Sequence, residues 1–142
     1  MNVICDRGES LPKSTFTVST AANGDQIITD SVTGLIWQKT YASNKTWKEA
    51  LEYCEGLDYA GYTDWRLPNA AEIFTFSDPT RTSTPKVALA GYSGIWPNDG
   101  MKNFWSSTTQ VSDTNIARSL TDYVGQLSYD NKTKGQYVRC VR

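Results

Sequence analysis

The sequence of 142 residues contains no histidine. Histidine is the commonest general base and the commonest metal ligand, so its absence excludes Ser-His-Asp and Cys-His catalytic sites and every zinc site that needs histidine. Only three cysteines occur, widely spaced, and they cannot supply a four-cysteine zinc site. These absences argue against most hydrolytic chemistry and predict that the protein is not an enzyme.

Long apolar runs and a charge excess are also missing. No run of about 18 apolar residues occurs, which predicts no membrane insertion. A net charge of −1 gives no overall attraction to nucleic acid, so no nucleic-acid partner is expected. The first ten residues lack the basic start and apolar core of a signal peptide. The chain is therefore either cytosolic or a piece of a longer exported protein, and its polar, turn-rich start favours the second.

The composition that remains is that of one folded domain. Hydrophobic residues make up 39% and charged residues 20% of the chain, which excludes disorder. Residues 1–22 form a lead segment with one edge strand near Phe16 and Val18. Beyond it, Ile27–Thr29 and Leu35–Gln38 are β-prone, and a turn containing Asp30, Ser31 and Gly34 separates them. This pattern predicts a β-hairpin or a bent pair of strands.

Two capping boxes predict two helices. Thr46 with Glu49 opens the first helix, which ends near Gly56–Asp58, and Asn69 with Glu72 opens a second that runs to about Phe76. The apolar residues of the first helix recur on one face, at Trp47, Ala50, Leu51, Cys54 and Leu57. Cys54 is therefore expected to point into the core.

The other segments read as strands and one long loop. Short strands are predicted at 62–67, 104–108, 116–121, 123–129 and 136–142, with a turn at 130–135. Residues 77–103 form a loop rich in Ser, Thr, Pro and Gly, and loops of this length are usually functional or disordered. The predicted class is α+β, with a mixed, mainly antiparallel sheet.

Four segments together resemble a known family: TDSVTGLIWQK (29–39), TWKEALEYCEGLDYAGYTDWRLPNAAEI (46–73), FWSSTT (104–109) and QYVRCVR (136–142). Their order and their amino-acid sequences are similar to those of the Lcl C-terminal domain, first named from a bacterial collagen-like adhesin. The resemblance covers residues 23–142, which we take as the domain.

The resemblance implies a C-type-lectin-like fold with paired terminal strands. It also implies a disulfide between Cys54 and Cys140, which requires an oxidising compartment and hence export. The alternative for this pair is two buried free thiols. Cys5 is left over, as a free thiol, a link to another chain or a link to a segment outside this sequence.

Family members are surface or secreted adhesin modules, and the named example is similar to a trimeric binder of sulfated polysaccharide. The resemblance thus implies a non-enzymatic module for a glycan or host-surface ligand, as a homotrimer or part of a larger surface protein. Two alternatives stay open. One is a protein-binding module of the hypervariable kind. The other is an enzyme similar to the formylglycine-generating branch, which would need a reactive cysteine pair.

Two groups of residues are candidates for ligand binding. Loop aromatic and polar residues suit a sugar, because a ring stacks on a pyranose and amides or carboxylates bind its hydroxyls; they are Tyr92, Trp96, Asn98 and Asp99. Cations could hold sulfate groups; they are Arg81, Lys86, Lys102, Arg118, Lys132, Lys134, Arg139 and Arg142. The alternatives are that Trp96 anchors the loop and that the cations are scattered solubilising charges.

No cofactor is predicted. Calcium needs six to eight oxygen ligands, and no dense acidic run supplies them. Trp65, Arg66 and Leu67 lie in a segment that resembles the family, and their expected role is in packing and not in ligand binding. Arg66 is expected to pair with a buried carboxylate or with carbonyls. Trp37, Trp47 and Trp105 are expected in the core.

Overall fold

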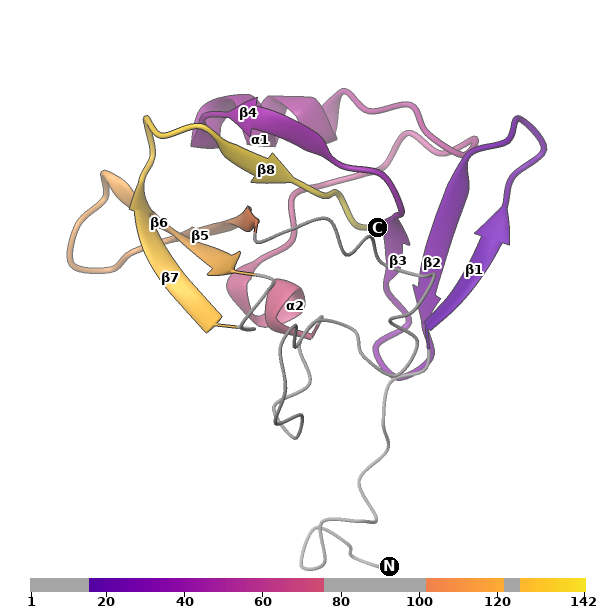
Figure 1. Ribbon diagram of the computed structural model, residues 1–142, viewed down its shortest axis with the longest axis horizontal. Helices are drawn as coiled ribbons and strands as arrows, with labels where there is room; N and C mark the ends of the chain where they lie inside the picture. The colour runs from indigo at the N-terminus through magenta and orange to yellow at the C-terminus, as the bar shows by residue number, and fades with distance from the viewer. Residues whose placement is uncertain (1–15, 76–101, 122–125) are drawn as a thin grey trace, which may run out of the picture.

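The computed structural model describes residues 16–75, 102–121 and 126–142 (Figure 1). The elements in chain order are β1 (Phe16–Thr20), β2 (Gln26–Asp30), β3 (Ile36–Gln38), β4 (Ala42–Lys45), α1 (Trp47–Glu55), α2 (Ala70–Phe74), β5 (Asn103–Thr109), β6 (Ile116–Thr121), β7 (Gln126–Asn131) and β8 (Gln136–Val138). The predicted α+β class, the hairpin of β2 and β3 and both capping boxes are confirmed.

The strands form two sheets rather than one. The first has the antiparallel order β1-β2-β3, with β1 at its edge as predicted. The second has the order β4-β8-β5-β6-β7, in which β5 and β8 run parallel and the other neighbours run antiparallel. The first and last strands of the described residues, β1 and β8, therefore lie in different sheets. The pairing of terminal segments is instead made between β3 and the residues that follow β8.

The C-terminal residues join the two sheets instead. Ile36 of β3 and Arg142 exchange backbone hydrogen bonds of 2.8 and 2.9 Å. On its other side, Val141 exchanges two bonds of 2.9 Å with Arg66. The chain after β8 thus leaves the second sheet and fills the free edge of β3, which is why β8 ends at Val138 and not at residue 142 (Figure 1).

The predicted strand at 62–67 is also wrong. In this segment Tyr62 and Arg66 form only isolated bridges, to Tyr59 and Val141 respectively. The indole of Trp65 donates to the carbonyls of Tyr59 and Tyr62, both at 3.1 Å. The same two carbonyls also accept from the backbone N–H groups of Tyr62 and Tyr59, so the chain closes on itself here as a turn and does not extend as a strand ladder.

Two smaller boundary predictions also change. β7 spans Gln126–Asn131 and ends two residues beyond the predicted 129, where the Asn131 side chain accepts from the backbone and hydroxyl of Thr133 in the following turn. Residues 123–125 of the prediction lie outside the described residues. α2 ends at Phe74, with Thr75 as its cap, so the prediction to residue 76 was too long.

The two helices cover opposite faces of the second sheet. Successive side chains of a strand point to opposite faces. On β5, Phe104 packs in one core cluster with Ile73 of α2, and Trp105 packs in the other with Cys54 of α1. Trp37 and Trp105 are fully buried as predicted, whereas Trp47 is half-buried.

The disulfide between Cys54 and Cys140 is present. Its Cα atoms lie 5.5 Å apart, and both residues are fully buried. This finding removes the alternative of two free thiols. Cys5 lies outside the described residues.

Arg66 pairs with a carboxylate as expected, although the pair is partly exposed. Its Nη1 and Nη2 donate to Glu72 at 2.6 and 2.7 Å, and Glu72 also accepts from the Asn69 backbone in the capping box of α2. The Arg66 hydrogen bonds hold the pKa of Glu72 below its ordinary value, against the opposing effect of burial.

We therefore expect Glu72→Gln to cost more stability at pH 7 than at pH 3. A carboxyl with a lowered folded-state pKa stabilises the fold above its unfolded pKa, and that contribution is lost as pH falls through the folded pKa. Because the pair is partly exposed, the difference should be about 1 kcal/mol or less. Urea denaturation of both proteins at the two pH values measures it, and an equal cost at both would contradict the assignment.

Candidate ligand-binding cleft

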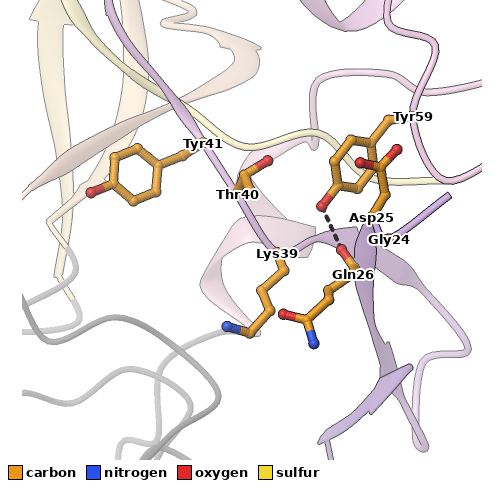
Figure 2. Close-up of a pocket in the computed structure, with 7 residues that line it drawn as sticks. All are labelled: Gly24, Asp25, Gln26, Lys39, Thr40, Tyr41 and Tyr59. Atoms are coloured by element: carbon orange, nitrogen blue, oxygen red, sulfur yellow. Dashed lines mark hydrogen bonds between the residues drawn. The ribbon is translucent and has the colours of Figure 1, made fainter. Parts of the chain in front are cut away.

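A cleft of about 410 Å³ lies beside the first sheet (Figure 2). A volume above about 300 Å³ is in the range of small-molecule sites. Its lining comes from three segments: the turn before β2, the connection from β3 to β4, and the chain after α1. The lining residues are Gly24, Asp25, Gln26, Lys39, Thr40, Tyr41 and Tyr59.

The first wall is the tight turn between β1 and β2. Gly24 has a φ of 94°, a conformation that L side chains rarely adopt, and this lets the chain reverse. The Asp25 carboxylate accepts from the Asn23 amide at 2.9 Å and from the Ala60 backbone at 2.8 Å. The turn is thereby tied to the chain that follows α1.

The second wall is the chain after α1, and its residue Tyr59 is joined to Gln26 beside the first wall. The Tyr59 hydroxyl donates to the Gln26 carbonyl at 2.6 Å, the bond drawn in Figure 2. The Tyr59 ring packs edge-on against Trp65, with ring centroids 5.7 Å apart. Because that hydroxyl is already a donor, only its lone pairs remain for a ligand. The Gln26 side chain is partly exposed.

The third wall is the connection Lys39–Tyr41. Its carbonyls at Lys39 and Thr40 accept hydrogen bonds from the buried guanidinium of Arg139, at 3.1 and 3.3 Å. In Figure 2 the Lys39 and Gln26 side chains extend the same way. Within the described residues Lys39 makes no ion pair, so its ammonium group is available to a ligand.

Tyr41 turns its ring away from Lys39 and Gln26, toward the second sheet (Figure 2). It packs edge-on against Phe104 and Tyr137, with centroid distances of 5.9 and 5.5 Å. Two cations lie over the same ring: Lys102 Nζ at 5.6 Å and the Arg139 guanidinium at 5.4 Å from its centroid. Cation–π contacts of this kind stabilise a buried charge and fix the ring.

Comparison with known families settles what kind of domain carries this cleft. The model of the Lcl C-terminal domain matches residues 26–142, most of the chain. The chain belongs to that family. The Lcl C-terminal domain is a domain of bacterial surface proteins, and its family is not an enzymatic one. No curated protein matches the chain.

The disulfide bears on the compartment in which the domain is found. The disulfide and the Lcl domain are consistent with an exported protein. Neither helix of the described ranges has the length and apolar character that a membrane span requires. In those same ranges no three Cys, Asp or Glu side chains gather as a metal site would need.

The described cations among those predicted from the sequence of this Lcl domain contact several different partners. Lys102 and Arg139 meet over Tyr41 and are both buried. The others contact separate partners. Lys132 lies 3.8 Å above the Trp47 ring and donates to Thr109, Lys134 pairs with Asp130, Arg118 stacks on Tyr129, and Arg142 pairs with Asp64.

The loop candidates of the Lcl domain lie outside the described residues. They are Arg81, Lys86, Tyr92, Trp96, Asn98 and Asp99. Their role in ligand binding stays a prediction.

Sequence reasoning missed the cleft residues of the domain. One local signal was present: the run Gln38–Tyr41 places a lysine, a threonine and a tyrosine directly after the buried strand β3. Polar residues at the end of a buried strand are common in sites. No local pattern connects that run with Asp25 or Tyr59, since tertiary contacts bring them together.

Proposed function

We propose that this domain is a non-enzymatic, extracellular module of adhesin type that recognises a glycan through the cleft lined by Lys39, Gln26 and Tyr59. The observation that carries the proposal is the convergence of an available ammonium group with amide, hydroxyl and carboxylate groups in one hollow. Few well-placed polar groups in a preformed hollow are typical of small-ligand sites.

The chemistry of the lining supports a saccharide. Sugar hydroxyls both donate and accept, and so do the Gln26 amide and the Thr40 hydroxyl. Lys39 adds a charged donor suited to an electronegative or acidic substituent, including sulfate. The walls are held by hydrogen bonds to Ala60, Gln26 and the Arg139 side chain, so little ordering is needed on binding.

The proposal includes the setting of the module. It includes a place on the cell surface or in secreted protein, with the domain acting as a homotrimer or as part of a larger surface protein. It also assigns a C-type-lectin-like fold, supported by the helix-to-C-terminus disulfide and the mixed α+β architecture. Sedimentation analysis of the purified chain tests the trimer.

A glycan array followed by calorimetry tests the binding site. We expect a saccharide signal that Lys39→Ala reduces roughly tenfold, because a hydrogen bond to a charged group contributes about 1.5–3 kcal/mol. Gln26→Ala should reduce it less. The matched control is Lys48→Ala, which removes an exposed lysine of α1 outside the cleft and should leave affinity unchanged.

Three outcomes separate the possibilities. Affinity that falls with Trp96→Ala but not with Lys39→Ala would move the site to the predicted loop. Signal insensitive to every one of these changes would refute both locations. Absence of any saccharide signal, together with capture of a defined protein, would favour the protein-binding module instead.

A further inference from the structure

The Lys39–Tyr41 wall depends on a buried arginine from the far end of the chain. Arg139 is 4% exposed, and its Nη2 and Nε donate to the carbonyls of Lys39 and Thr40. These partners are 99 and 100 residues away in sequence. A planar guanidinium can serve two neighbouring carbonyls at once, which an ammonium group cannot do in the same geometry.

Gln38 is the second support of the same wall. Its side chain is 1% exposed and uses both ends of the amide. Nε2 donates to the Thr40 hydroxyl at 3.0 Å and to the Tyr53 hydroxyl at 2.9 Å, while Oε1 accepts from the Cys140 backbone at 3.0 Å. Its own backbone N–H donates to the Cys140 carbonyl at 3.0 Å.

Both supports are linked to residues next to the disulfide. Tyr53 precedes Cys54 in α1, and Arg139 precedes Cys140. The bridge therefore fixes the distance between α1 and the C-terminal residues, and Gln38 spans that distance through its bonds to Tyr53 and Cys140. A change in this spacing cannot leave both Gln38 bonds intact.

We propose that Gln38 and Arg139 are positioning residues for the cleft, and that the Cys54–Cys140 disulfide sets the shape of the Lys39–Tyr41 wall through them. The inference rests on the proposed function of the cleft. It follows that the cleft is complete only in the bridged protein. A folded protein without the bridge keeps its sheets but holds Lys39 loosely, and binds a saccharide more weakly.

The alternative is that the bridge and its neighbours only add overall stability. The two cases differ in which backbone amides exchange their hydrogen faster when a support is removed. Local opening frees the amides of one segment, whereas a global loss of stability also exposes those of the central strands. The Lys39 amide, which donates to the Gln26 carbonyl at 3.3 Å, reports on the wall. The amides of β6, a strand with neighbours on both sides, report on the body of the domain.

The experiment is residue-resolved hydrogen exchange by NMR, without any ligand. The variants are Gln38→Met, Arg139→Met and the double change Cys54→Ala with Cys140→Ala. Losing the bridge alone lowers the free energy of unfolding and so accelerates exchange throughout the core. Each variant is therefore compared with wild-type protein in the urea concentration that gives the same free energy of unfolding. Against this match we expect exchange at Lys39 to be at least tenfold faster in each variant, and exchange in β6 to differ less than twofold. Lys48→Met is the control, since Lys48 is an exposed residue of α1 outside the cleft and should affect neither amide group.

Unchanged exchange at Lys39 in folded Gln38→Met and in the bridge-free protein would overturn the proposal, and so would equal acceleration in β6. If Arg139→Met does not fold, Arg139→Lys decides: it keeps the charge but loses the paired donors, and should accelerate Lys39 exchange. Calorimetry then measures the affinity for the saccharide that gives the strongest array signal. We expect this affinity to be at least tenfold lower in the bridge-free protein than in the wild type. If the wild-type protein binds no saccharide, the proposed function fails while the exchange result still tests the positioning roles.

Discussion

Replacing Cys54 and Cys140 together with alanine is expected to lower the free energy of unfolding by about 4–5 kcal/mol. The bridge joins residues separated by 86 positions, and its removal returns a large loop-closure entropy to the unfolded chain. Because small domains are stable by only about 5–15 kcal/mol, this loss is a large fraction of the total. Urea denaturation at pH 7, followed by tryptophan fluorescence, measures it.

Two controls identify the bridge as the cause. Cys5→Ala removes the third cysteine and should leave the urea midpoint unchanged. A dithiol reductant added in denaturant should destabilise the wild-type protein by a similar amount and have no effect on the double variant. A loss below about 1 kcal/mol would show that the bridge adds little to the stability of this fold.

Trp105→Ala is expected to cost about 3–5 kcal/mol, the second large effect. The Trp105 side chain is fully buried on β5, in the cluster that contains Cys54 and Val138. Its Nε1 donates to the Lys45 carbonyl at 2.9 Å, so truncation both opens a cavity and removes a hydrogen-bond donor. Thermal and urea unfolding measure the change.

Trp105→Phe separates the two contributions. It keeps most of the ring but leaves the Lys45 carbonyl without that donor, and should cost about 1–3 kcal/mol. Tyr129→Ala is the matched control: that ring is 49% exposed, and its loss should cost less than about 1 kcal/mol. A similar cost for Tyr129→Ala and Trp105→Ala would contradict the placement of Trp105 at the centre of the domain.

The sequence predicts best where the determining interactions are local. Thr46 with Glu49, and Asn69 with Glu72, are capping boxes whose partners lie three residues apart, and both helices begin where those boxes predict. The strand predicted at 62–67 was wrong because β-prone composition does not encode the partners that a strand needs. Tyr62 pairs back with Tyr59 and Arg66 pairs with Val141, each as an isolated bridge.

The candidate site was missed because it depends on long-range contacts and not on local ones. The family resemblance directs attention to cations, and most of the described cations are held by an aromatic ring, a carboxylate or a carbonyl of another element. The cleft residues come together through contacts such as Tyr59 to Gln26, which span 33 residues. Contacts over such distances arise from the packing of α1 and the sheets, which no local pattern encodes.

The position of residues 139–142 between β3 and the Arg66 segment has a consequence for the order of folding. Backbone and side-chain bonds from this stretch reach Gln38, Lys39 and Arg66, with a sequence separation of 102 for the bond between Cys140 and Gln38. Contacts of this kind form late and slow the folding of a domain. Until residues 139–142 are in place, β3 lacks the partner of its second edge and the Lys39–Tyr41 connection lacks the Arg139 bonds. The core of this domain therefore cannot close before its last residues are available to the rest of the chain.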